Sequence, residues 1–160
     1  MAKTYEPIAT TTVSGSSTST ITFNSFSGYT DLRLVMVSQN ADAYCLIRLN
    51  GDSSALYSRT TLQGNGTSAS SGRASNETAW YPSTGDATRT ANAIIEIMNY
   101  SNTTTNKTAL TRVNLPFDVV VAQAWLYRST SAITSITLTV PSTNNWVAGS
   151  TFTLYGVKSA

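Results

Sequence analysis

The 160-residue chain has no histidine and only one cysteine. Histidine is the commonest general base and metal ligand, so its absence excludes Ser-His and Cys-His nucleophiles. The lone Cys45 cannot close a disulfide within the chain, and its apolar neighbours predict a small, buried side chain. Because Cys/His clusters and calcium loops of the DxDxDG type are also missing, we predict no metal, no cofactor and no catalytic residue.

Charge is scarce as well. Charged residues make up 11% of the chain, and lysine occurs only at Lys3, Lys107 and Lys158. The net charge is +2 and the arginines are scattered singly, so no basic cluster predicts a nucleic-acid partner. No apolar run approaches the ~20 residues that span a membrane, and the N-terminus lacks the pattern of a signal peptide. We therefore expect no membrane partner and synthesis in a cytoplasm.

Hydroxyl side chains take the place of the missing charges. Serine and threonine account for roughly three residues in ten, far above ordinary usage. Lysine and glutamate lose much side-chain entropy when they are held in an interface, and interface cores are depleted in them. A chain poor in both residues suits large contact areas. This composition indicates an assembled structural protein or an extracellular binding module rather than a cytosolic enzyme.

Apolar residues alternate with polar ones along most of the chain, and no segment shows an apolar stripe of helical period. Turn signals such as NGD (50–52), GNG (64–66) and PSTNN (141–145) separate the alternating runs. This pattern predicts an all-β fold, an antiparallel β-sandwich that is jelly-roll-like, with Trp125 in its core. The expected strands are 20–24, 31–38, 43–50, 93–100, 107–114, 117–128, 135–140 and 150–158.

The N-terminal segment differs from the rest. The stretch TTTVSGSSTS (10–19) is low in complexity and has almost nothing to bury. We predict an extended N-terminal arm or linker over residues 1–19 and the β-sandwich domain over 20–160. Tyr5, Pro7 and Ile8 form a small apolar cluster that could anchor on a neighbouring subunit. The alternative is a short edge strand on the same domain.

The segment QGNGTSASSGR (63–73) is rich in glycine and hydroxyls. A phosphate-binding loop needs GxxxxGK[ST] between a strand and a helix, whereas here the spacing is wrong and Arg73 stands where lysine belongs. No amphipathic helix follows. We expect a long surface connection between two strands, in which glycine relieves the backbone.

Two further groups of residues are candidate sites. Glycoside hydrolysis needs two carboxylates facing each other, and a sandwich could bring Glu77 and Glu96 together, although nothing in the sequence requires it. Trp80, Tyr81 and Trp146 lie beside loop segments and could form a platform for a glycan. The alternative for the two tryptophans is that they close the ends of the sandwich or are buried against a neighbouring subunit.

Six segments follow one another along the chain: YEPIATTTV (5–13), ITFNSFSGYTDLRLVMV (21–37), IRLNGDSSALYSRTTLQGNGTSASSGR (47–73), IIEIMNYSNTTTNKTALTR (94–112), LYRSTSAITSITLTV (126–140) and FTLYGV (152–157). Their succession resembles a family of small virion proteins of tailed bacteriophages, common in aquatic and cyanobacterial phages. The resemblance implies a non-enzymatic jelly-roll-like protein seated on the virion, synthesised in the host cytoplasm. It implies a homotrimer that binds the major capsid protein as a head decoration (cement) protein; the alternative is a tail or fibre component that recognises a host surface glycan, with tail proteins as partners.

Overall fold

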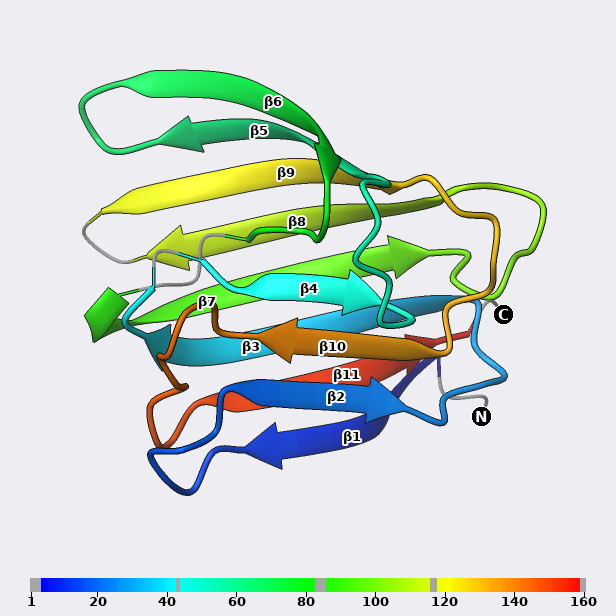
Figure 1. Ribbon diagram of the computed structural model, residues 1–160, viewed down its shortest axis with the longest axis horizontal. Coiled ribbons are helices and arrows are strands. Elements are labelled where there is room, and N and C mark those ends of the chain that lie inside the picture. The colour runs from blue at the N-terminus through cyan, green and yellow to red at the C-terminus, as the bar shows by residue number, and fades with distance from the viewer. Residues whose placement is uncertain (1–3, 43, 83–85, 116–117, 159–160) are drawn as a thin grey trace.

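The computed structural model describes residues 4–42, 44–82, 86–115 and 118–158. Within these residues all regular secondary structure is β-strand, and there is no helix. This confirms the predicted all-β antiparallel sandwich (Figure 1). The strands are β1 (Tyr5–Thr12), β2 (Thr20–Asn24), β3 (Asp31–Asn40), β4 (Leu46–Leu49), β5 (Tyr57–Gly64), β6 (Ala69–Glu77), β7 (Asp86–Met98), β8 (Lys107–Leu115), β9 (Val119–Tyr127), β10 (Ser135–Thr139) and β11 (Thr151–Val157).

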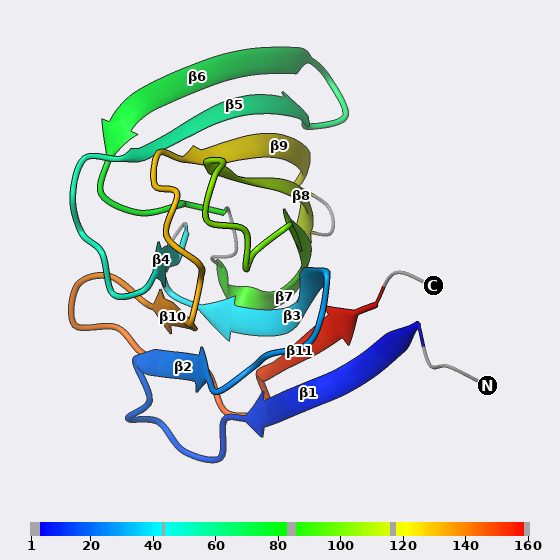
Figure 2. The same ribbon diagram turned by 90° about the vertical axis from the view of Figure 1, so that its right-hand side faces the viewer.

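The strands form two sheets of unequal size. The larger sheet has eight strands in the order β1-β11-β3-β7-β8-β9-β5-β6, and the smaller has three in the order β2-β10-β4. The small sheet lies over β11, β3 and β7, whereas β9, β5 and β6 extend beyond it (Figures 1 and 2). One end of the large sheet therefore has no second sheet above it. We call the side of the large sheet that faces the small sheet its inner face, and the opposite side its outer face.

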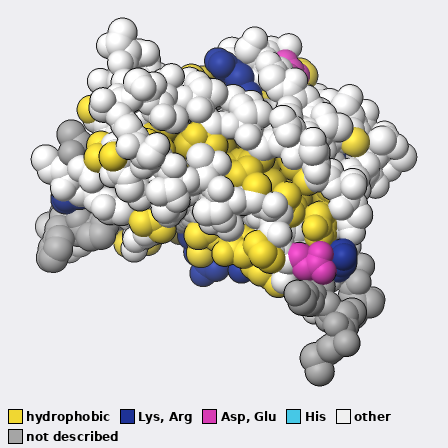
Figure 3. Space-filling view, turned by 90° about the horizontal axis from the view of Figure 1, so that it is seen from below, with side chains coloured by type: hydrophobic (Ala, Val, Ile, Leu, Met, Phe, Trp, Pro, Cys, Tyr) yellow, Lys and Arg dark blue, Asp and Glu magenta, His cyan; other side chains and the backbone are white. Residues whose placement is uncertain are grey.

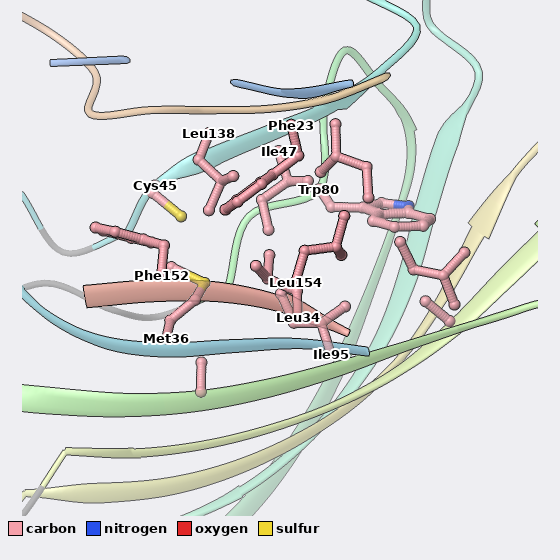
Figure 4. Packing of buried hydrophobic residues seen from close by; sticks show 14 of the residues in the cluster. Phe23, Leu34, Met36, Cys45, Ile47, Trp80, Ile95, Leu138, Phe152 and Leu154 are labelled. Carbon is pink, nitrogen blue, oxygen red and sulfur yellow. The ribbon is translucent and has the colours of Figure 1, made fainter. Parts of the chain in front are cut away.

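The core fills the space between the two sheets. Leu34, Met36 and Phe152 of the large sheet point toward Ile47 and Leu138 of the small one (Figure 4). All five are at most 1% exposed. Burying an aliphatic or aromatic side chain contributes about 1.5–3 kcal/mol, so this alternating set is the main source of stability. The predicted burial of Cys45 and Trp125 is confirmed, because their side chains are 0% and 3% exposed.

β1 corrects the prediction of an N-terminal arm. Residues 5–12 pair antiparallel with β11, from Tyr5 opposite Val157 to Thr12 opposite Thr151. The extended arm is therefore wrong for these residues, and the alternative of an edge strand on the same domain holds. Threonines support the pairing, since Thr10 and Thr153 hydrogen-bond through their hydroxyls at 3.1 Å. Strand pairing, rather than apolar burial, orders this polar segment.

The β5–β6 hairpin corrects the reading of the 63–73 segment. Gln63 and Gly64 end β5, Ala69 begins β6, and only a four-residue turn at 65–68 lies between them. The Asn65 side chain closes this turn, because its Oδ1 accepts hydrogen bonds from the backbone N–H groups of Thr67 (3.1 Å) and Ser68 (2.9 Å). The long surface connection was expected because this hairpin is polar on both faces and so lacks an apolar alternation.

A turn at the end of β4 carries a pH-sensitive carboxylate. Asp52 Oδ1 accepts the Ser54 backbone N–H at 2.7 Å, and Oδ2 accepts the Tyr127 hydroxyl at 2.7 Å. Hydrogen bonds from Ser54, and then from Tyr127, hold the pKa of Asp52 below its usual value. Because the folded pKa lies below the unfolded value of about 3.9, this carboxylate stabilises the fold above that pH. Its contribution is lost as the pH falls through the folded pKa.

We expect Asp52→Asn to lower the free energy of unfolding by about 1 kcal/mol at pH 7 and to flatten its decline in acid. Urea denaturation at pH 7 and pH 3 measures both effects. The control is Asp118→Asn, whose exposed ion pair with Arg89 (3.7 Å) should be worth only a few tenths of a kcal/mol. An Asp52→Asn variant that loses stability in acid as steeply as the wild type would contradict the assignment.

Candidate functional site

The two carboxylates weighed for glycoside hydrolysis lie on opposite faces of the large sheet. Glu96 pairs with Arg33 and lies opposite Leu110, which is 54% exposed on the outer face. Glu77 pairs with Arg59 at 3.3 Å on the inner face. Burial raises the pKa of Glu77, and Arg59 opposes that shift. Because the sheet separates the two groups, they cannot flank one glycosidic bond.

Trp80 and Trp146 do not form a glycan platform. Each is 1% exposed, so neither ring face is available to a sugar. Trp80 packs near the rings of Tyr57 (6.2 Å) and Trp125 (5.9 Å), and Trp146 packs on Phe152 at 4.7 Å between centroids. The glycan prediction is wrong for both tryptophans, which are buried within this chain without any neighbouring subunit.

Tyr81 remains half-buried beside the inner face. Its hydroxyl hydrogen-bonds that of Thr78 at 3.1 Å, and its ring meets Tyr44 edge-on at 5.4 Å. The Arg59 guanidinium lies 5.6 Å from the ring centroid. Of the three predicted glycan contacts, Tyr81 is the one with ring surface still exposed.

The predicted subunit contacts lie along the β1 edge. Tyr5 is 39% exposed, with its ring 4.9 Å from that of Tyr155 and 5.1 Å from the Arg33 guanidinium. Pro7 is exposed at a register shift of β1, whereas Ile8 packs on the domain's own core. The Ile8 side chain therefore makes its apolar contacts within its own chain. Figure 3 shows a band of hydrophobic side chains on the side of the molecule where β1 lies.

The outer face of β5, β8 and β9 carries the most exposed of the large apolar side chains in the described residues. Leu62, Leu110 and Val120 are 59%, 54% and 66% exposed. Ala122 and Ala124 lie between the larger side chains and leave a groove of about 430 Å³. We call this set the outer apolar face: Leu62, Ile94, Leu110, Val120, Ala122 and Ala124. Its signal in the sequence was the second apolar face of the strand expected at 117–128.

A second, polar groove of about 260 Å³ lies at the β5–β6 hairpin. The groove is lined from alternate positions of β5 by Arg59, Thr61 and Gln63, and from β6 by the run 70–73, which includes Gly72 and Arg73. Sequence reasoning missed this groove, because the hairpin was expected to be an irregular connection.

The comparisons with known proteins include a distant structural likeness. The sequence matches no protein-family model and no curated protein. Among solved structures, the galectin LEC-6 of Caenorhabditis elegans aligns with 97% of this chain and 94% of its own, at 12% identity and a TM-score of 0.33.

Two features are absent from the described part of the chain. There, no helix is long and apolar enough to cross a membrane. Nor do three or more histidine, cysteine, aspartate or glutamate residues in the described ranges form a group that could hold a metal ion.

Proposed function

We propose that the chain is a non-enzymatic structural protein of a phage virion, a decoration protein that binds the outside of the assembled head and stabilises it. The outer apolar face is the observation that carries the proposal. Single exposed leucines are ordinary, whereas neighbouring ones on a rigid sheet indicate an interaction surface. The resemblance to virion proteins supplies the partner, the shell of major capsid protein.

The chemistry of the outer apolar face suits binding to another protein. Its side chains are short and held by a sheet, so burying them costs little conformational entropy. The nearest acid, Glu96, is already paired with Arg33, so docking leaves no carboxylate unpaired at that position. Each large side chain that becomes buried contributes up to about 1.5–3 kcal/mol. A protein that binds only the assembled shell stabilises that shell by mass action.

The same proposal includes a homotrimer with contacts along the β1 edge. Tyr5 and Pro7 are exposed there, and β1 leaves one side of its backbone unpaired at the sheet edge. Subunits that meet at this edge would keep the outer apolar face free for the shell.

The first test is the copy number in purified virions, by quantitative mass spectrometry against the major capsid protein. We expect hundreds of copies, in a fixed ratio to the shell. A handful of copies per particle would overturn the decoration role in favour of a tail or fibre component. Absence from the particle would overturn any virion role.

The second test is Leu110→Glu, which places a charge in the middle of the outer apolar face. We expect at least a tenfold loss of affinity for heads that lack the protein, about 1.4 kcal/mol, measured by co-sedimentation. The control is Thr22→Glu, an exposed position on β2 in the other sheet. Equal binding by both folded variants would show that this face is not the surface that binds the head.

A further inference from the structure

We propose that the polar groove at the β5–β6 hairpin is a binding site for a neutral saccharide, separate from the capsid-binding face. The hairpin belongs to the part of the large sheet that extends beyond the small one (Figure 2). The groove side chains of β5 share the inner face with Trp125, because Arg59 lies opposite Trp125 in the strand pairing. The groove is therefore on the other side of the sheet from Leu62 and Leu110.

The groove presents the donors and acceptors that sugar hydroxyls need. Thr61, Gln63 and Ser70 supply two hydroxyls and one amide, each of which both donates and accepts hydrogen bonds. Gly72 has no heavy atom within 4 Å of the position a Cβ would take, so a ligand can approach the β6 backbone there. Arg59 adds guanidinium donors, and its ion pair with Glu77 compensates its charge. Arg73 also lines the groove, but it lies opposite Thr60, so its side chain projects from the other face of the sheet. A neutral polyhydroxyl ligand fits this set better than an anion.

Two buried polar atoms in the row beside the groove have no hydrogen-bond partner in the described part of the chain. Thr111, Gln123 and Thr61 lie side by side across β8, β9 and β5. Gln123 is 6% exposed, and its Oε1 has no hydrogen-bond partner among the described residues; the same holds for the hydroxyl of Thr111, 2% exposed. Such groups cost stability, whereas the next row of this sheet face carries Val113 and Val121. A polar row kept at this cost indicates a role other than packing.

This row connects directly to the groove. Gln123 Nε2 donates to Thr61 Oγ1 at 3.3 Å. The Thr61 hydroxyl accepts this bond, so its own hydrogen is free to point toward a ligand in the groove. The buried glutamine thereby orients a donor at the groove surface.

Arg59 is held in place before any ligand arrives. Its guanidinium lies 5.6 Å from the centroid of Tyr81 and 5.7 Å from that of Trp125, and Nη1 is 3.3 Å from Glu77 Oε1. A donor fixed by two rings and a carboxylate loses little entropy on binding. Tyr81, the half-exposed aromatic residue beside Arg59, adds an apolar surface next to the groove.

The test is a titration of the ¹⁵N-labelled full chain, followed by amide chemical shifts. The neutral probes are maltohexaose, cellohexaose, mannohexaose and chitohexaose; a galacturonate hexamer and inorganic phosphate are the charged ones. We expect at least one neutral probe to shift amides of β5 and β6. Thr61→Val should weaken that binding at least tenfold. Thr60→Val, on the same strand but the opposite face, should leave it unchanged.

Three outcomes would overturn the proposal. No response to any neutral probe excludes the saccharide site, and a response confined to the galacturonate hexamer or phosphate assigns an anion site instead. Equal weakening by the Thr60 and Thr61 variants places the ligand elsewhere. Because the isolated chain is used, none of these outcomes bears on capsid binding.

Discussion

Gly156→Ala is expected to lower the free energy of unfolding by about 3 kcal/mol, measured by urea denaturation. Gly156 lies in β11 directly against the ring of Tyr29. A Cβ at this position would sit 2.2 Å from Tyr29 Cδ1 and 2.3 Å from Cγ, closer than real side-chain carbons approach. The ring is half-buried against the core, so it must leave its packed position to make room.

Nearby contacts hold the Tyr29 ring where it is. The Lys158 ammonium lies 5.3 Å from the ring centroid, and the backbone N–H of Thr30 donates to Val157 O at 2.8 Å. These contacts join the segment before β3 to the end of β11. The ring therefore cannot swing away without loss of contacts on both sides.

Two variants make the Gly156 prediction specific. Gly72→Ala, in an edge strand with open space around it, should change stability by no more than about 1 kcal/mol, in either direction. In the double variant Gly156→Ala with Tyr29→Ala, the two effects should not add, because the clash is gone once the ring is removed. Full additivity would show that Tyr29 is not the obstacle.

Trp80→Ala is expected to cost about 4 kcal/mol, the usual range for a buried aromatic truncated to alanine. The indole fills the space between Tyr57 and Trp125, and its Nε1–H donates to Leu126 O at 3.4 Å. The backbone of Trp80 is also bridged to Ile47, with both N–H···O distances at 2.9 Å. Removing the ring would leave a cavity between the small sheet and the part of the large sheet that extends beyond it.

The matched control is Tyr81→Ala, the next residue along the chain. Tyr81 is only half-buried, so we expect a loss of about 1 kcal/mol, well below that for Trp80. Thermal and urea denaturation of both variants give the comparison. A Trp80→Ala variant as stable as the wild type would refute the structural role assigned here and reopen Trp80 as a ligand contact.

Strands with one apolar face were predictable from the sequence. β2, β3, β8, β9, β10 and β11 lie close to their expected ranges because alternate residues in each are buried. β5 and β6 were missed, and β1 was given only as the alternative to an arm, for the opposite reason. Each is an edge strand or joins one, and polar residues occupy both of its faces, so pairing with a neighbour orders it rather than burial.

The candidate sites divide in the same way. The outward set of Val120, Ala122 and Ala124 was visible as the second apolar face of one strand. Only strand pairing brings Leu62 and Leu110 beside it, from positions far away in the sequence. The polar groove could not be predicted without the β5–β6 hairpin, which forms it. The predicted tryptophans are buried because a residue next to a loop in the sequence can still face the core.

The sequence by itself determined the class of fold and the absence of histidine chemistry, because both follow from residue types and a period of two. Tertiary structure decided which faces are covered. An alternating strand has two faces, and its own residues do not say whether another sheet will lie over either of them. That depends on long-range pairing. The small sheet covers β11, β3 and β7 on the inner face, so the polar groove at β5 and β6 lies beyond it. The apolar groove lies on the opposite, outer face of the large sheet.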